Sequence, residues 1–130
     1  MTIALWCLFF AGVMHTLSKG PLATYMAKAP GGYNNNMPRE QAASLEGVGK
    51  RALAIHLNQI ESFPLFAAGV LVATASSINA PVIDYLALAY VAARIIYIPL
   101  YLKDIATMRT LVWSVGYGSS LALMCSPAWV

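Results

Sequence analysis

The chain has 130 residues, of which 59% are hydrophobic and 10% are charged, and its mean hydropathy is +0.65. An average soluble domain has roughly 25% charged residues. The composition therefore excludes a disordered chain and argues against an ordinary water-soluble domain of this size. The length predicts one domain that spans residues 1–130.

Long stretches of the chain carry no charge. Residues 1–18, 62–83 and 110–130 contain no Lys, Arg, Asp or Glu. Each stretch is about the ~20 residues that a helix needs to cross a bilayer. We therefore predict an all-α integral membrane protein built as a four-helix up-and-down bundle. The four predicted spans are residues 3–25, 47–76, 81–102 and 105–127.

The N-terminal apolar run has a second interpretation, a cleaved signal peptide. A signal peptide begins with a basic region, but here the first basic residue, Lys19, follows the apolar run. We therefore expect this run to be a member of the bundle. A turn-rich loop is predicted at residues 29–38 and a tight turn at residues 76–81, and Pro81 and Asp84 suit the start of a helix.

The basic residues predict the orientation. Seven of the eight lie in or beside the two connections that an up-and-down bundle places on one side: Lys19, Lys28, Arg39, Lys50, Arg51, Lys103 and Arg109. By the positive-inside rule that side is cytoplasmic and both termini are outside. The net charge of +3 then reflects topology, and no basic patch with interleaved aromatic residues indicates nucleic-acid binding.

Glu61 and Arg94 fall inside the predicted spans. Counted from the helix ends, both lie about 20 Å from the outer face. Ionised groups inside a membrane usually pair and face the bundle interior. The sequence therefore predicts a Glu61–Arg94 ion pair; it marks a functional site or, alternatively, only clasps two helices together.

Helical spacing adds other polar and aromatic side chains to this region. The members are Arg51, Asn58 and Glu61 on the second span, Tyr90, Arg94, Tyr97 and Tyr101 on the third, and Arg109, Thr110 and Trp113 at the start of the fourth. His56 falls away from this face and is predicted to pack between helices. Guanidinium groups with one carboxylate suit a small zwitterionic ligand, and the apolar surroundings suit a lipophilic second substrate from the bilayer. The two histidines have no partners at metal-ligand spacing, so no metal is expected.

These residues resemble those of a known family, the membrane-associated proteins in eicosanoid and glutathione metabolism (MAPEG). The resemblance is to a bacterial-type member of that family. The motifs are Lys50-Arg51-Ala52 with His56, Asn58, Glu61 and Phe63-Pro64-Leu65-Phe66, the run from Ala93 to Tyr101, and Arg109-Thr110. Length, number of helices, the long first loop and the orientation agree across essentially the whole chain. The resemblance implies a homotrimer in a bacterial inner membrane, with sites between protomers near the cytoplasmic face.

The resemblance also implies a function. Members typically bind glutathione as cosubstrate and conjugate it to lipophilic electrophiles, reduce lipid hydroperoxides, or isomerise eicosanoids. The glutathione-binding residues implied are Arg51, Asn58, Glu61, Arg94, Tyr97 and Tyr101. The catalytic residues implied are Arg109 and Thr110. A cation at a helix N-terminus lowers the pKa of a thiol from about 8.5 towards neutrality, which suits Arg109 to hold a thiolate.

The sequence departs from the family at several positions of the predicted site. Lys50 stands where Glu is frequent, and Ala54 and Leu57 stand where glutathione-binding members of the mammalian type carry arginines. Thr110 replaces a common Ser and Trp113 a common Tyr. A different thiol, or none, stays an alternative to glutathione, as does a non-catalytic lipid-binding or substrate-presenting protein of the same fold. A third hypothesis is a small transporter or channel subunit. The outer half of the predicted bundle contains few polar residues, which argues against it.

Overall fold

The computed structural model describes residues 1–130 and contains helices only. The helices and their bounds are α1 (Ile3–Leu17), α2 (Lys19–Ala27), α3 (Pro38–Ala43), α4 (Gly47–Ala75), α5 (Pro81–Leu102), α6 (Ala106–Met124) and a 3₁₀ turn, η1 (Ser126–Ala128). The bounds of α5 are those predicted, and the ends of α4 differ from the prediction by one residue at most. The short helix α3 was not predicted, although Pro38 in its first turn and Glu40 two residues on are typical helix-start residues.

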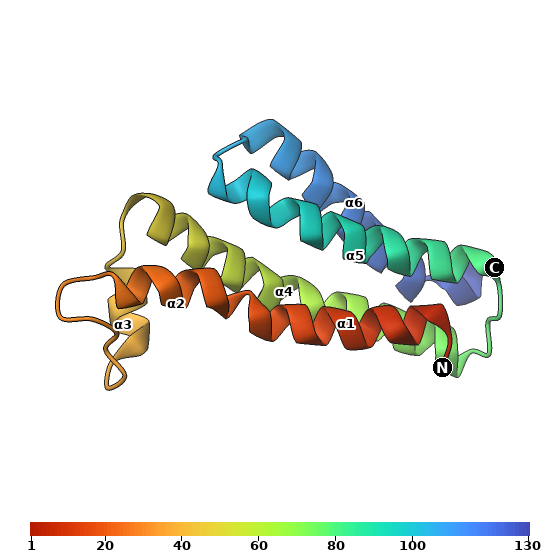
Figure 1. Ribbon diagram of the computed structural model, residues 1–130. Helices are drawn as coiled ribbons and strands as arrows, with labels where there is room; N and C mark the ends of the chain where they lie inside the picture. Colours follow the sequence, from red (N-terminus) through yellow and green to blue (C-terminus); the bar gives the residue numbers. More distant parts are fainter.

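The long helices form four rods that lie side by side (Figure 1). The first rod consists of α1 and α2 in line, and α4, α5 and α6 are the others. Successive rods run in opposite directions, so both termini lie at one end of the molecule. The short helix α3 and the connection between α5 and α6 lie towards the other end (Figure 1).

The first rod is broken at Ser18, where the sequence predicted one continuous helix. Pro21 has no N–H to donate to the carbonyl of Leu17, so the helical hydrogen-bond ladder is interrupted there. The buried Ser18 hydroxyl donates to the carbonyl of His15 at 2.8 Å and lies 2.8 Å from Nδ1 of His56 on α4. The hydrogen bond between Ser18 and His56 thus links the break in the first rod to α4.

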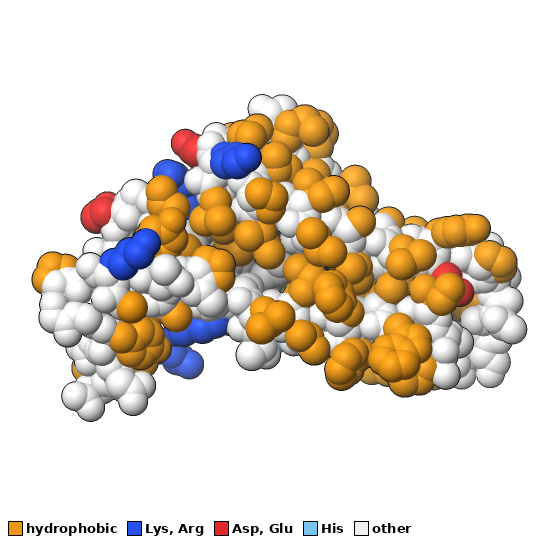
Figure 2. All heavy atoms as spheres, viewed as in Figure 1, with side chains coloured by type: hydrophobic (Ala, Val, Ile, Leu, Met, Phe, Trp, Pro, Cys, Tyr) orange, Lys and Arg blue, Asp and Glu red, His pale blue; other side chains and the backbone are white.

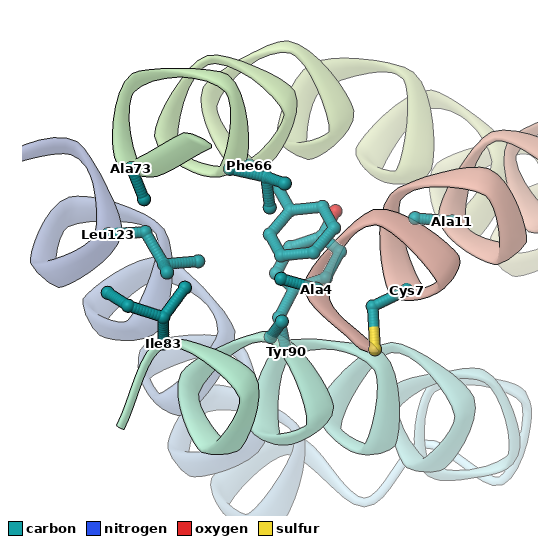
Figure 3. Close-up of a cluster of buried hydrophobic side chains, with 10 residues drawn as sticks. Ala4, Cys7, Ala11, Phe66, Ala73, Ile83, Tyr90 and Leu123 are labelled. Atoms are coloured by element: carbon teal, nitrogen blue, oxygen red, sulfur yellow. The ribbon is translucent and has the colours of Figure 1, made fainter. Parts of the chain in front are cut away.

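The main hydrophobic cluster lies near the end that carries the termini, and all four rods contribute to it (Figure 3). The rings of Phe66 and Tyr90 stack in parallel at its centre, with 3.8 Å between centroids and 4° between planes. Small residues of α1, Ala4 and Ala11, belong to the same cluster. Side chains of this size let the first rod approach α4 and α5 closely.

At Gly69, α4 lies in close contact with α6. A Cβ atom there would lie 2.8 Å from Cβ of Leu123 and 2.9 Å from the carbonyl oxygen of Ser120. Gly116, one turn before Ser120, faces α5, where an added Cβ would lie at ordinary contact distance, 3.7 Å from Cβ of Ala93. Small residues therefore set the spacing of α6 against both neighbours.

Hydrogen bonds at the helix ends hold the connections. The backbone N–H of Ile78 donates to Ala73, and that of Ile105 donates to Leu100, with Ser77 and Asp104 in left-handed conformation. This six-to-one bond is the Schellman arrangement that ends a helix. At the start of the chain, the N–H of Ala4 donates to a carboxylate oxygen of Asp84 at 2.9 Å, so Asp84 lies beside the N-termini of both α1 and α5.

Two helical segments are long and apolar enough to cross a membrane, Ile3–Ala27 and Pro81–Leu102. The sequence predicted four such spans. The other two rods, α4 and α6, are less apolar because they carry charged, hydroxyl and amide side chains. Lys and Arg side chains gather towards the end with α3, and hydrophobic side chains cover much of the rest of the visible face (Figure 2).

Candidate functional site

A cavity of ≈ 170 Å³ lies between α4, α5 and α6. The residues that line it come from one face of each helix: Asn58, Glu61, Ser62 and Leu65 of α4, Tyr90 and Arg94 of α5, and Trp113, Gly116, Tyr117 and Ser120 of α6. Their spacing by three and four residues places them on one side of each helix. Ser120, the lining residue of α6 nearest the C-terminus, also lies beside Gly69 of α4.

Arg94 is the charged group inside this cavity. Its side chain is 3% exposed, and Nη1 donates to Oδ1 of Asn58 at 2.9 Å. Its other two groups, Nε and Nη2, have no hydrogen-bond partner. An unpartnered buried donor costs free energy, and more so when it is charged. Arg94 therefore carries two buried donor groups for which the chain itself supplies no acceptor.

The predicted ion pair between Glu61 and Arg94 is wrong. The helices are offset along their length, so that the partner of Arg94 is Asn58, one helical turn from Glu61. Glu61 lines the same cavity but is exposed, which places its carboxylate at the rim. The cavity thus has a cation inside and an anion at its mouth.

Three hydrogen bonds fix the register of α4 against α5. Nε of Arg51 donates to the carbonyl of Leu102 at 3.3 Å, Arg94 donates to Asn58, and the hydroxyls of Ser62 and Tyr90 are 3.0 Å apart. Each step towards the C-terminus of α4 is matched by a step back along α5, as antiparallel helices require. Arg51 is thereby placed at the C-terminal end of α5 and is not part of the cavity lining.

A continuous series of cationic and aromatic side chains leads from the cavity towards the start of α6. The guanidinium of Arg94 lies 4.3 Å from the ring centroid of Tyr97. The rings of Tyr97 and Tyr101 meet edge to face at 5.6 Å, and the guanidinium of Arg109 lies 4.4 Å from the centroid of Tyr101. Cations stack favourably on aromatic faces. Four residues predicted from the sequence are therefore brought together, although two of them, Tyr97 and Tyr101, turn their rings to cations of the chain.

Thr110 does not reach the cavity. Its side chain is exposed, and its hydroxyl donates to the carbonyl of Ala106 one turn earlier in α6. Of the eight predicted site residues, the cavity lining contains Asn58, Glu61 and Arg94. Ser62, Leu65 and Tyr117 also line the cavity and were not predicted; the signal available was their spacing from Asn58 and Trp113 on the same helical faces.

His56 faces away from the cavity, as its position around the helix predicted. Its Nδ1 is hydrogen-bonded to Ser18, and the rings of His15 and His56 stack with centroids 6.5 Å apart. His15 also stacks on Phe63, at 5.7 Å. These residues join the first rod to α4.

Comparison with families of known proteins decides the relationship. The model of the MAPEG family matches residues 3–129, nearly the whole chain. The chain belongs to the MAPEG family. Comparison with curated proteins and with solved structures gave no match. This MAPEG protein is therefore a membrane protein of the family of glutathione and eicosanoid metabolism.

The site of this MAPEG chain places polar side chains between helices whose other faces are apolar. The cavity offers a buried guanidinium, an amide, four hydroxyls (Ser62, Tyr90, Tyr117 and Ser120) and a carboxylate at its rim. No group of three or more His, Cys, Asp or Glu side chains lies together in the chain. The donors present suit carboxylate and amide groups of an organic ligand.

Proposed function

We propose that this protein is a membrane-bound, glutathione-dependent transferase or peroxidase that acts on lipophilic electrophiles or lipid hydroperoxides. The observation that carries the proposal is Arg94, buried in a MAPEG chain with two donor groups unpartnered at a cavity. A buried charge of this kind is retained for a ligand more readily than for packing.

The donor set fits glutathione. Arg94 presents Nε and Nη2 for a carboxylate, which prefers two parallel N–H donors of one guanidinium. Glu61 at the rim can accept from the ammonium group of the same γ-glutamyl end, and Asn58 keeps the guanidinium oriented. We assign these three residues to the carboxylate and ammonium groups of glutathione.

The second part of the proposal concerns the thiol. Arg109 lies in the first turn of α6, where the helix N-terminus also favours negative charge. Its stacking on Tyr101 fixes the guanidinium without using its N–H donors. We assign Arg109 to stabilise the thiolate and Tyr97 and Tyr101 to hold the two arginines apart. Arg51 supports the site indirectly, through the end of α5, and Thr110 is available only after a change of rotamer.

Glutathione, when bound, supplies a thiolate that forms a C–S bond while the leaving group departs with its bonding electrons; with a hydroperoxide, two thiols give alcohol, water and a disulfide. The chain's residues do the rest. Arg94 and Glu61 position the tripeptide, Arg109 keeps the sulfur deprotonated, and the surrounding apolar surface admits the second substrate from the bilayer.

The proposal includes the membrane arrangement. We propose that all four rods cross the bilayer as an up-and-down bundle, because the polar side chains of α4 and α6 line the cavity between them and leave apolar faces for lipid. An exposed Glu61 in a membrane helix favours a homotrimer in which another protomer covers it. The basic end is proposed to be cytoplasmic, in a bacterial inner membrane, with both termini outside.

The second candidate function is a non-catalytic lipid-binding or substrate-presenting protein. A groove of ≈ 350 Å³ between α1, α2, α4 and α5, with apolar side chains such as Phe10, Met14 and Ile98, favours it. Ala54 and Leu57 also leave fewer cations for a tripeptide than in other members.

The deciding experiment uses the purified full-length protein in detergent or nanodiscs. Calorimetric titration with glutathione and assay of conjugation to a small electrophile should both be positive, and Arg109→Ala should abolish turnover while the protein keeps its oligomeric state. Absence of glutathione binding and of turnover, with a co-purifying lipid, would establish the second candidate instead.

A further inference from the structure

The first rod changes its packing partners at the break at Ser18. Before the break, Ala11 of α1 shares a buried cluster with Ala87 of α5. After the break, Leu22 and Met26 of α2 share a separate buried cluster with residues of α3 and α4. The groove of ≈ 350 Å³ between α1, α2, α4 and α5 lies where these two packings part, and Ser18 is one of the residues that line it.

The lining of this groove is apolar. Its six hydrophobic side chains are those of Phe10, Met14, Leu17, Ile55, Ile95 and Ile98. Met14 and Ile55 are buried and form the floor, whereas Leu17 and Ile95 are 66% and 48% exposed. The Ser18 hydroxyl is already hydrogen-bonded within the chain, so it requires no polar ligand. A contiguous exposed apolar surface of this kind marks a site where another molecule binds.

The place and length of the groove suit an acyl chain. It lies between Ile3–Ala27 and Pro81–Leu102, the two helical segments long and apolar enough to cross a membrane. From Phe10 to Pro21 is 21 − 10 = 11 residues, or about 16 Å along a helix axis. Half of the hydrocarbon core of a bilayer is about 15 Å thick. The groove therefore has the length of the lipid chains of one leaflet.

A cation lies at the end of the groove that points towards the basic end of the molecule. Ile55 and Ile98 line the groove, and Arg51 and Leu102 each lie one helical turn beyond them on the same two helices. Nε of Arg51 donates to the carbonyl of Leu102 at 3.3 Å, so α4 and α5 meet directly past the groove. Arg51 is half-buried, and this bond leaves its Nη1 and Nη2 groups for a ligand.

We propose that the groove holds an acyl chain of an anionic phospholipid from the surrounding leaflet and that Arg51 binds the phosphate of the same molecule. A guanidinium donates two parallel hydrogen bonds to phosphate oxygens, and a basic surface at the membrane attracts anionic lipids. This groove and the Arg94 cavity share no lining residue, so the lipid is a resident component and not the second substrate. The inference rests on the proposed membrane arrangement and needs no thiol chemistry.

The first experiment separates the chain from the head group. The purified, delipidated full-length protein in detergent is titrated with dipalmitoyl phosphatidylglycerol, and bound lipid is counted by native mass spectrometry. Dipalmitoylglycerol, which has the chains without the phosphate, should bind about tenfold more weakly. Glycerol 3-phosphate, which has the phosphate without the chains, should not bind. Equal binding of the two lipids overturns the role of Arg51, and binding of glycerol 3-phosphate overturns the role of the groove.

Two neighbouring residues of α5 give a matched pair for the groove. Ile95 and Ile96 are both 48% exposed, but only Ile95 lines the groove. Ile95→Trp should raise the Kd for phosphatidylglycerol about three- to tenfold, because the indole takes the place and the contacts of the chain. Ile96→Trp should bind as the unchanged protein does. Equal affinity in the two variants overturns the proposal, as does a change of oligomeric state in Ile95→Trp alone, which would show that a second copy covers the groove.

The head-group contact has its own pair of variants. Arg51→Gln should raise the Kd for phosphatidylglycerol about tenfold and leave the Kd for dipalmitoylglycerol unchanged. Arg39→Gln, an exposed change on α3, should alter neither. If both arginine variants weaken phosphatidylglycerol equally, the attraction is diffuse and the Arg51 site is wrong. Selective lipid binding without glutathione turnover supports the lipid site and overturns the enzyme function, whereas turnover with unselective lipid binding does the reverse.

Discussion

Nη1 of Arg94 donates a 2.9 Å hydrogen bond to Oδ1 of Asn58, and this contact joins α5 to α4 beside the cavity. The bond fixes the guanidinium plane while leaving Nε and Nη2 unpartnered. The Asn58 amide thus orients the buried guanidinium of Arg94 and its two remaining donor groups. The arrangement explains how a membrane helix can carry an arginine that no carboxylate of the chain neutralises.

The first prediction follows from this orientation. Arg94→Lys keeps the charge but loses the planar pair of donors. We expect the Kd for glutathione, measured by calorimetry, to rise on the order of tenfold or more, since a hydrogen bond to a charged group contributes about 1.5–3 kcal/mol. Arg39→Lys, an exposed change on α3, is the matched control and should leave the Kd unaltered. If the two variants bound glutathione with equal affinity, Arg94 would not be part of the glutathione site.

Much of the fold followed from local sequence signals. Uncharged stretches and helix-start residues predicted α5 with the bounds observed and α4 to within one residue. The break at Ser18 was missed because the apolar pattern continues through it, whereas the cause is the missing N–H of Pro21. Patterns of polarity report which residues are buried, and they are less sensitive to a single absent hydrogen bond.

The candidate site was harder to predict than the helices. The sequence identified Arg94 and the helix faces that surround it, because charge in an apolar run is conspicuous. It paired Arg94 with Glu61 by counting residues from the end of the second span and the start of the third, which assumes that these two helix ends are level. The contacts observed between α4 and α5 depend instead on side-chain packing and hydrogen bonds such as Asn58–Arg94 and Ser62–Tyr90. Such packing is a tertiary property that no local pattern encodes.

The second prediction concerns Arg109. Removing its charge by Arg109→Ala should let the pKa of the bound thiol return towards about 8.5, so less thiolate is present at neutral pH. Turnover should therefore fall at pH 7, and the deficit should shrink as the pH rises through that value. The measurements are the pH–rate profile and the ultraviolet absorbance of the thiolate. Arg39→Ala should keep the native profile, and a deficit that is constant with pH would contradict the assigned role.

The third prediction concerns Asp84. Its carboxylate accepts from the N–H of Ala4 and lies in the first turn of α5, so it faces the positive ends of two parallel helices. Asp84→Ala should lower the free energy of unfolding by about 1 kcal/mol, the usual value of an N-terminal cap. Asp84→Asn, which keeps an acceptor, should lose less. Glu46→Ala is the control, because Glu46 is exposed and its side chain caps no helix; equal Tm losses in both would refute the capping role.

The last prediction tests the close contact between α4 and α6 at Gly69. In Gly69→Ala the new methyl group would lie 2.8 Å from Cβ of Leu123 and 2.9 Å from a backbone oxygen of Ser120, so α4 and α6 have to separate. Overpacking of this kind costs typically about 1–3 kcal/mol, and the Tm in detergent should fall. The control is Gly118→Ala on α6, where no atom lies within 4 Å of the added carbon. Because alanine is favoured over glycine in a helix by roughly 0.5–1 kcal/mol, the control should raise the Tm. Changes of the same sign in both variants would show that Gly69 is not the point at which α4 and α6 are held together.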